Sequence, residues 1–444
     1  MRSYLILGMC ALFLFQYFLE LQWLEYLVVG LSLIAFMSSA LKADRFPRWL
    51  GIIMMISGLI IEWKKGTGLS GISEGIFLIL PLICLLTLAP LLSIPLRVGG
   101  YFESIAVLLR NLLHHPKKLY AGITGTLFLL APILNLGSVR IINEFLEEIK
   151  LPSVMSAKSY LVGFASAILW SPYFASVSLV LHYLNISFKE YILYGIGLSL
   201  LSLVVGNILF AIWEKRHPLS ADLTPISPIE KGNRIQLIKL IIFVVILMSS
   251  CLLIESYTHW SMIVIVCLVS IIVPFLFGLL TRNWKRLVPP LVDFRDRSVP
   301  MMNNEIMLFM SAGMLAFAMK GTNAANGVSD FLSHLAQQSF ILFALAVMLI
   351  VLCITYIGIH QIAAVGALAM QLNAGDLLIS NVGLALLLLL TWSISTALSP
   401  FSGLNLMVSR FTGISGIQTG LRANGLHLSI LALIGIILIS FIGK

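Results

Sequence analysis

Four short stretches combine helix-breaking and polar residues inside otherwise apolar sequence. They are "LLAPILNLGSVR" (129–140), "ILWSPYFAS" (168–176), "TYIGIHQIAAVG" (355–366) and "LSPFSGLNLMVSR" (398–410). Proline removes an amide donor and glycine permits turns that other residues resist, so each stretch is expected to interrupt a helix. Interrupted helices expose hydroxyls, carbonyl oxygens and helix N-termini, which bind small cations and anions. We therefore predict a binding site at these breaks.

The candidate binding residues are the polar and helix-breaking residues of the four stretches. They are Asn135, Gly137, Ser138, Ser171, Pro172, Gly358, His360, Gln361, Ser399, Pro400, Ser402 and Asn405. A single proline kink with a nearby serine is usually only a kink, so the prediction depends on the four breaks together. His360 could carry a proton or donate to a substrate, and a structural bond to a carbonyl explains it equally well. No catalytic residue, cofactor or metal is predicted, apart from a coupling Na+ or H+ at the same breaks.

The sequence around these stretches has the composition of a membrane protein. Of its 444 residues 59% are hydrophobic and only 11% charged, whereas soluble proteins carry about 25% charged residues. Apolar runs long enough to cross a bilayer predict an all-α polytopic fold of about 11 transmembrane helices. The expected spans are 4–18, 24–41, 47–62, 75–95, 158–184, 189–212, 237–255, 260–280, 304–320, 381–408 and 427–441. Two interrupted segments, 118–150 and 339–372, are predicted to be re-entrant hairpins.

The distribution of basic residues predicts the orientation of these spans. With both hairpins returning to the side they enter from, 23 of the 28 Lys and Arg residues fall on the cytoplasmic side. The positive-inside rule then places the N-terminus in the cytoplasm and the C-terminus outside, in a multi-pass protein of the cell inner membrane. The net charge of +9 is therefore explained by topology and membrane lipid, and no nucleic acid partner is expected.

A repeat relates the two halves of the chain. At an offset of 228 residues, "WSPYFASVSLVLHYLNIS" (170–187) aligns with "LSPFSGLNLMVSRFTGIS" (398–415), and 171–203 shares 10 identities in 33 positions with 399–431. Chance similarity of two proline-kinked helices is the alternative. The predicted organisation is an extra N-terminal span (1–23), a first inverted repeat (24–212), a cytoplasmic linker (213–236) and a second inverted repeat (237–444). The repeats contain broken helices at 158–184 and 381–408. Inverted repeats with broken helices are typical of secondary transporters.

In this architecture the chain resembles the ion transporter superfamily, which contains the divalent anion–sodium symporters. The resemblance covers nearly the whole chain and implies an elevator-type carrier, often a homodimer, with hairpin tips and broken helices around substrate and coupling ion. The symporter branch carries Ser-Asn-Thr at each tip. Here the tips read Asn135-Leu136-Gly137-Ser138 and Gly358-Ile359-His360-Gln361. Only Asn135 and Ser138 match that pattern.

These observations predict a secondary active transporter that moves a small organic anion, coupled to sodium or protons by elevator-type alternating access. The sequence has no GxxxxGK[ST], which argues against an ATP-driven pump. It has no HExxH and no paired carboxylates at mid-membrane depth, which argues against an intramembrane protease and a carboxylate-based cation–proton exchanger. We therefore do not expect an enzyme. One alternative is a flippase-like carrier of an amphipathic or lipid-linked substrate. A membrane enzyme acting on polyprenyl phosphates and a receptor built on a transporter fold are two others.

Overall fold

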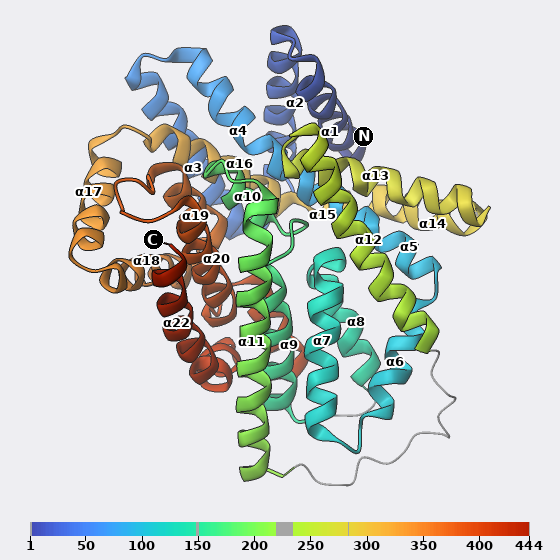
Figure 1. Cartoon of the computed structure of the whole chain (residues 1–444). Helices are drawn as coiled ribbons and strands as arrows, with labels where there is room; N and C mark the ends of the chain where they lie inside the picture. Colours follow the sequence, from blue (N-terminus) through green and yellow to red (C-terminus); the bar gives the residue numbers. More distant parts are fainter. Residues whose placement is uncertain (1, 148–150, 219–233, 283, 444) are drawn as a thin grey trace.

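The computed structural model describes residues 2–147, 151–218, 234–282 and 284–443, and these residues form helices and connecting turns without any strand (Figure 1). The helices of the first half are α1 (Arg2–Leu19), α2 (Gln22–Ala40), α3 (Arg45–Lys65), α4 (Gly68–Leu88), η1 (Ala89–Leu92), α5 (Ser93–Val98), α6 (Tyr101–Asn111), α7 (Pro116–Leu134), α8 (Leu136–Leu146), α9 (Ser153–Ile168), α10 (Ala175–Tyr183) and α11 (Phe188–Arg216). Those of the second half are α12 (Arg234–Thr258), α13 (Met262–Thr281), α14 (Trp284–Asp293), η3 (Phe294–Ser298), α15 (Val299–Met301), α16 (Asn303–Met319), α17 (Asn323–Gln338), α18 (Phe340–Tyr356), α19 (Gln361–Gln371), α20 (Asn381–Leu398), α21 (Gly403–Thr412), η4 (Gln418–Arg422) and α22 (Ala423–Ile442).

The helices confirm a polytopic membrane protein. Within the described ranges, nine helices are long and apolar enough to cross a membrane, and they coincide with nine of the eleven predicted spans. The other two predicted spans are also helical. One is divided into α9 and α10, and the other is α16, which has 17 residues.

Two of the predicted spans are broken where proline was expected to break them. Residues 169–174 separate α9 from α10, and residues 399–402 separate α20 from α21. A residue that precedes proline is pushed out of the helical region. Ser399, which precedes Pro400, accordingly has φ −66° and ψ 122°. The local sequence thus explains why each span is divided into two shorter helices.

The two interrupted segments form helix–turn–helix units. Helices α7 and α8 lie side by side and are joined at Asn135, whose φ is +49° (Figure 1). Helices α18 and α19 are joined by a turn in which Gly358 has φ +99°. Positive φ is rare outside glycine, and asparagine is among the side chains that tolerate it best. The turns therefore fall on residues that suit them, while re-entry of these units into a membrane stays a prediction.

Several boundaries differ from those predicted. Helix α11 continues to Arg216 and α12 begins at Arg234, so the connection is shorter than the predicted linker 213–236. Most of that linker and the last residues of the predicted hairpin 118–150 lie outside the described residues. Helix α17, which carries polar residues along one side, follows a span and was not predicted.

Helix α9 is the central element around the breaks. It packs against α7, α11, α20, α21 and α22. At Gly163 the two backbones come so close that an added Cβ would lie 3.0 Å from the Thr124 Cα of α7. Glycine is needed here because any larger residue would separate α7 from α9. This contact holds the first helix–turn–helix unit against the first broken helix.

Candidate functional site

A cavity of about 320 Å3 lies where four helices begin. Its wall contains residues 135–137, 174–176, 360–362 and 402–404, which are the starts of α8, α10, α19 and α21. The first amides of a helix have no partner within the helix, and its N-terminus carries the positive end of the helix dipole. Both helix–turn–helix units and both broken helices therefore direct positive helix ends at one cavity.

Side chains cap three of these four helices. Asn135 Oδ1 accepts a hydrogen bond from the Leu136 amide at 2.8 Å, and Ser402 Oγ accepts one from the Asn405 amide at 3.0 Å. His360 Nδ1 accepts one from the Ile362 amide at 3.2 Å. Because Nδ1 is the acceptor, the neutral imidazole of His360 carries its proton on Nε2. These caps fix the helix starts that form the cavity wall.

The charged groups of the cavity are few. Among its lining residues, all within the described ranges, Glu305 of α16 and His360 are the two titratable side chains, and none is Lys or Arg. A negative charge on a ligand would therefore meet helix ends and amides instead of cationic side chains. Phe164, Phe309 and Trp392 supply apolar surface beside them. The Phe309 ring lies edge to face with the His360 ring, with 5.3 Å between the centroids.

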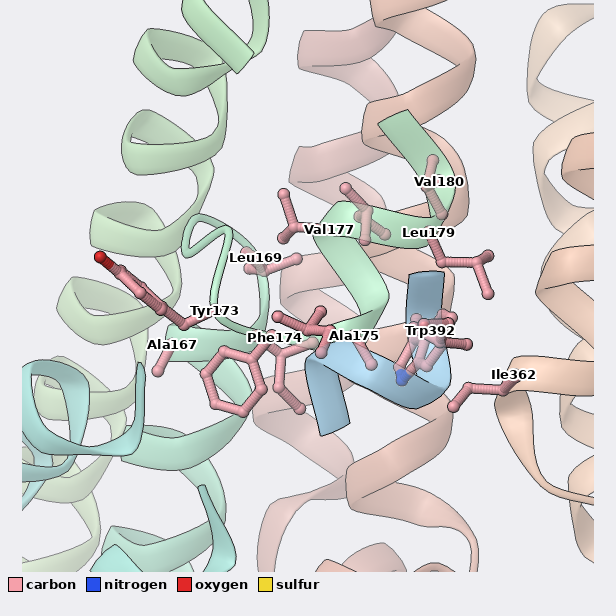
Figure 2. Close-up of a cluster of buried hydrophobic side chains, with 14 of the residues drawn as sticks. Ala167, Leu169, Tyr173, Phe174, Ala175, Val177, Leu179, Val180, Ile362 and Trp392 are labelled. Carbon is pink, nitrogen blue, oxygen red and sulfur yellow. The ribbon is translucent and has the colours of Figure 1, made fainter. Parts of the chain in front are cut away.

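One edge of the cavity belongs to a cluster of buried hydrophobic side chains. Figure 2 shows Phe174 and Ala175 at the start of α10, with Trp392 and Ile362 nearby. All four residues line the cavity. The first broken helix thus contributes mostly apolar surface, with Ser176 as its polar group, and the other polar groups come from the remaining three helix starts, from α16 and from Thr396 of α20.

Gln361 is the most conspicuous polar group of the cavity. Its side chain is only 3% exposed, it lines the cavity, and within the described part of the chain its amide has no hydrogen-bond partner. An amide that opens onto a cavity can donate to and accept from a water or a ligand there. Gln361 is therefore the side chain best placed to bind a polar ligand.

The structure brings five of the twelve candidate residues to the cavity: Asn135, Gly137, His360, Gln361 and Ser402. The other seven do not line it: Ser138, Ser171, Pro172, Gly358, Ser399, Pro400 and Asn405. Most of these seven are buried within the breaks, where their hydrogen bonds go to the protein itself. Their positions stabilise the helix starts without facing the cavity.

Serines occupy equivalent positions in the two broken helices. Ser171 Oγ accepts a hydrogen bond from the Tyr173 amide at 3.3 Å, and Ser399 Oγ accepts one from the Phe401 amide at 3.3 Å. Ser399 Oγ also donates to the Thr355 carbonyl at 2.8 Å, which ties the second break to α18. In the first helix–turn–helix unit, Ser138 Oγ donates to the Asn135 carbonyl at 2.7 Å.

Asn405 stabilises the second break through side-chain hydrogen bonds. It is fully buried, and its side-chain nitrogen donates to the Ala397 carbonyl at 3.0 Å and to the Gly416 carbonyl at 3.1 Å. Ala397 lies in the last turn of α20, where carbonyls lack partners within the helix. The Asn405 amide therefore replaces, at Ala397, a backbone hydrogen bond that the break removes, and it also joins the break to the turn at Gly416.

Three polar lining residues were not among the candidates: Glu305, Ser176 and Thr396. Glu305 is the acidic residue in the first turn of α16, and in the sequence it looks like an ordinary residue at the end of a span. Ser176 follows the Ser-Pro of the first break, which was a usable signal. Thr396 lies inside a long apolar run, so nothing in the local sequence indicates that it lines the cavity.

The fold is one that a solved membrane transporter also has. The chain is similar to the structure of the YdaH transporter of Alcanivorax borkumensis, with a TM-score of 0.58 and 12% sequence identity, over 86% of this chain and 90% of that one. At this identity the similarity shows the fold alone. No family model matches the sequence, and no curated protein matches it.

Proposed function

We propose that the protein is a secondary active transporter that moves a small organic anion across the cell inner membrane. The observation that carries this proposal is the convergence of the starts of α8, α10, α19 and α21 on one cavity. Helix N-termini bind anions through unpaired amides and the helix dipole, and broken transporter helices use them in this way. The transporter fold of a solved structure supports the same class.

The size of the cavity supports a small substrate. Small-molecule sites typically have volumes of about 300–1,000 Å3, and the cavity has about 320 Å3. A lipid-linked substrate would need a larger or laterally open site. The volume therefore favours a small organic anion over the flippase-like alternative.

The coupling ion is sodium or a proton. Hydroxyl and carbonyl oxygens at the breaks, such as those of Ser402 and Thr396, suit a sodium ion, since hard cations prefer oxygen ligands. Glu305 and His360 are the lining groups that could bind a proton. Symport of either ion with the anion, in an elevator-type movement, is the mechanism we propose.

The inverted repeat, the orientation of the termini and a homodimer belong to the same proposal. The equivalent bonds of Ser171 and Ser399 support the repeat, because each accepts from the amide two residues further along at 3.3 Å. The resemblance to the ion transporter superfamily rests on the helix–turn–helix units and broken helices. We propose membership of this superfamily on the basis of that architecture. The two tips differ in sequence from the Ser-Asn-Thr signature of the symporter branch.

Transport by the purified protein in liposomes tests the function. Labelled mono- and dicarboxylates are offered outside, with an inward sodium gradient, an inward proton gradient, or neither. We expect saturable accumulation of at least one anion under one of the two gradients, and none in liposomes without protein. A folded protein that neither accumulates nor exchanges any of these anions would refute the proposal.

A further inference from the structure

A second cavity, of about 180 Å3, is lined by basic side chains from three helices. They are Lys158 of α9, Arg216 and His217 at the end of α11, and His427 of α22. Helix α11 contacts α7, α9 and α22, and Figure 1 shows α22 on one side of it and α9 and α7 on the other. We propose that this cavity binds the phosphate group of an anionic membrane lipid.

The positive charges in this cavity are not neutralised by carboxylates within the described part of the chain. Lys158 Nζ donates to the Ala423 carbonyl and lies 5.9 Å from the centroid of the Trp213 ring. Arg216 has no ion pair or hydrogen bond to any described residue. Glu214, from the same turn of α11, pairs with Lys117 at 3.5 Å. Ammonium and guanidinium groups in this state are the usual partners of phosphate oxygens.

A buried polar group at the back of the cavity also lacks a partner. His427 is 5% exposed, and its Nε2 makes a 3.0 Å hydrogen bond with the Ser202 carbonyl. Its Nδ1 has no hydrogen-bond partner among the described residues. Because the Ser202 carbonyl accepts, Nε2 donates, and Nδ1 of the neutral ring is therefore an acceptor. A water or a hydroxyl of a lipid headgroup could donate to Nδ1, whereas a phosphate oxygen could not. The cavity thus combines two cations, which suit a phosphate group, with an acceptor that suits a headgroup hydroxyl.

The surroundings of the cavity select a lipid over a soluble phosphate compound. Two of its lining residues are exposed and apolar, namely Leu426 (67% exposed) and Ile212 (48% exposed). They lie on α11 and α22, two helices that are long and apolar enough to cross a membrane. An acyl chain could cover these side chains while its headgroup meets Lys158 and Arg216.

The second cavity lies at the end of α11, as expected for a site that binds a lipid headgroup. Arg216 is the last residue of α11, and Trp213 in the same turn is a typical residue of the membrane interface. Basic pockets between transmembrane helices on the cytoplasmic side bind anionic lipid headgroups. The distribution of basic residues predicts that this end of α11 lies in the cytoplasm.

Lipid titration of the purified full-length protein tests the site. Thermal unfolding and native mass spectrometry are followed with phosphatidylglycerol, cardiolipin, phosphatidylcholine, inorganic phosphate or glycerol phosphate. The site variant is K158Q/R216Q, and the control is K118Q/K215Q, which removes the same charge from basic residues that do not line the cavity. Lys158→Arg keeps the charge and reports whether loss of binding is only loss of folding.

We expect the anionic lipids to raise the unfolding temperature by several degrees and to remain bound in the mass spectrum. Their affinity should fall at least about tenfold in K158Q/R216Q and stay unchanged in K118Q/K215Q and Lys158→Arg. Equal losses in site and control variants would overturn the proposal, because general surface charge would then explain the binding. An equal effect of phosphatidylcholine, or of inorganic phosphate or glycerol phosphate, would also overturn it.

Discussion

The hydroxyl of Ser393 in α20 donates a 2.8 Å hydrogen bond to the carbonyl of Ala165 in α9, and the two residues are 228 positions apart. This is the offset at which 170–187 aligns with 398–415. Where two equivalent halves are related by a two-fold axis, equivalent residues touch only where the elements cross that axis. The bond therefore supports the predicted inverted repeat, with α9 and α20 crossing at its centre.

Replacing Ser393 by alanine is expected to destabilise the protein by about 1 kcal/mol, because a fully buried interhelical hydrogen bond is lost. Thermal unfolding in detergent measures the effect. The control is Ser256→Ala, since the exposed Ser256 hydroxyl bonds only to the Leu253 carbonyl of its own helix. If both variants unfold at the same temperature, the crossing of α9 and α20 does not depend on this bond.

Asn405→Ala is expected to cost about 1–3 kcal/mol of stability, because it leaves the buried carbonyl of Ala397 and the part-buried carbonyl of Gly416 without its amide. Thermal unfolding in detergent again measures the effect. Asn373→Ala serves as the control, because Asn373 is exposed and caps only the nearby Gly375 amide. A wild-type unfolding temperature for Asn405→Ala would contradict a structural role for this residue.

Much of the fold could be predicted from the sequence because a bilayer imposes length and hydropathy on each span. The breaks could be predicted as well, since proline and glycine act locally. Helix α16 shows the limit of this reasoning. Its apolar run indicates a span, but nothing in it indicates that Glu305 faces the same cavity as Gln361.

The site was only partly predictable, and two amides explain why. Gln361 and Asn405 both lie in polar stretches at helix breaks. Gln361 is the first residue of α19 and faces the cavity, whereas Asn405 is the third residue of α21 and turns back to the end of α20. Their roles depend on helix phase and on long-range packing, which the composition of a stretch does not contain. Trp392, inside an apolar run, had no local signal at all.

Gln361→Leu is expected to separate binding from stability. The leucine has a similar volume and removes an amide that faces the cavity and bonds to none of the described residues, so the unfolding temperature should stay the same or rise. Anion affinity should fall at least about tenfold, or about 1.4 kcal/mol. Gln371→Leu, at the other end of α19 and away from the cavity, should leave affinity unchanged. Undiminished binding by Gln361→Leu would exclude its amide as a ligand.

Gly137→Leu is expected to block the cavity by filling it. An added Cβ at Gly137 would meet no atom within 4 Å, and leucine favours a helix over glycine by somewhat less than about 1 kcal/mol. The variant should therefore fold, yet lose anion binding. Gly125→Leu is matched to it, because Gly125 lies in α7 with the same open space but does not line the cavity. Equal binding by both variants would place the anion elsewhere.

Glu305→Gln is expected to strengthen anion binding at the pH values where Glu305 is ionised. The ionised carboxylate repels the anion and the neutral amide does not, so affinity should rise at least about threefold at high pH and stay unchanged at low pH, where the carboxyl group is protonated. Binding isotherms at several pH values measure this, with Glu103→Gln as the control, because Glu103 is exposed on α6 and outside the cavity. If Glu305→Gln instead bound the anion more weakly, the carboxylate would be assigned as a ligand of the coupling cation.

The most direct test of the anion site is equilibrium binding of labelled mono- and dicarboxylates to the purified protein. The comparison uses wild type, Gln361→Leu and Gly137→Leu, with Gln371→Leu and Gly125→Leu as controls. The convergence of four helix starts predicts saturable binding of at least one anion, lost in both cavity variants and kept in both controls. Binding that survives both cavity substitutions, or a folded wild-type protein that binds none of the anions, would contradict it.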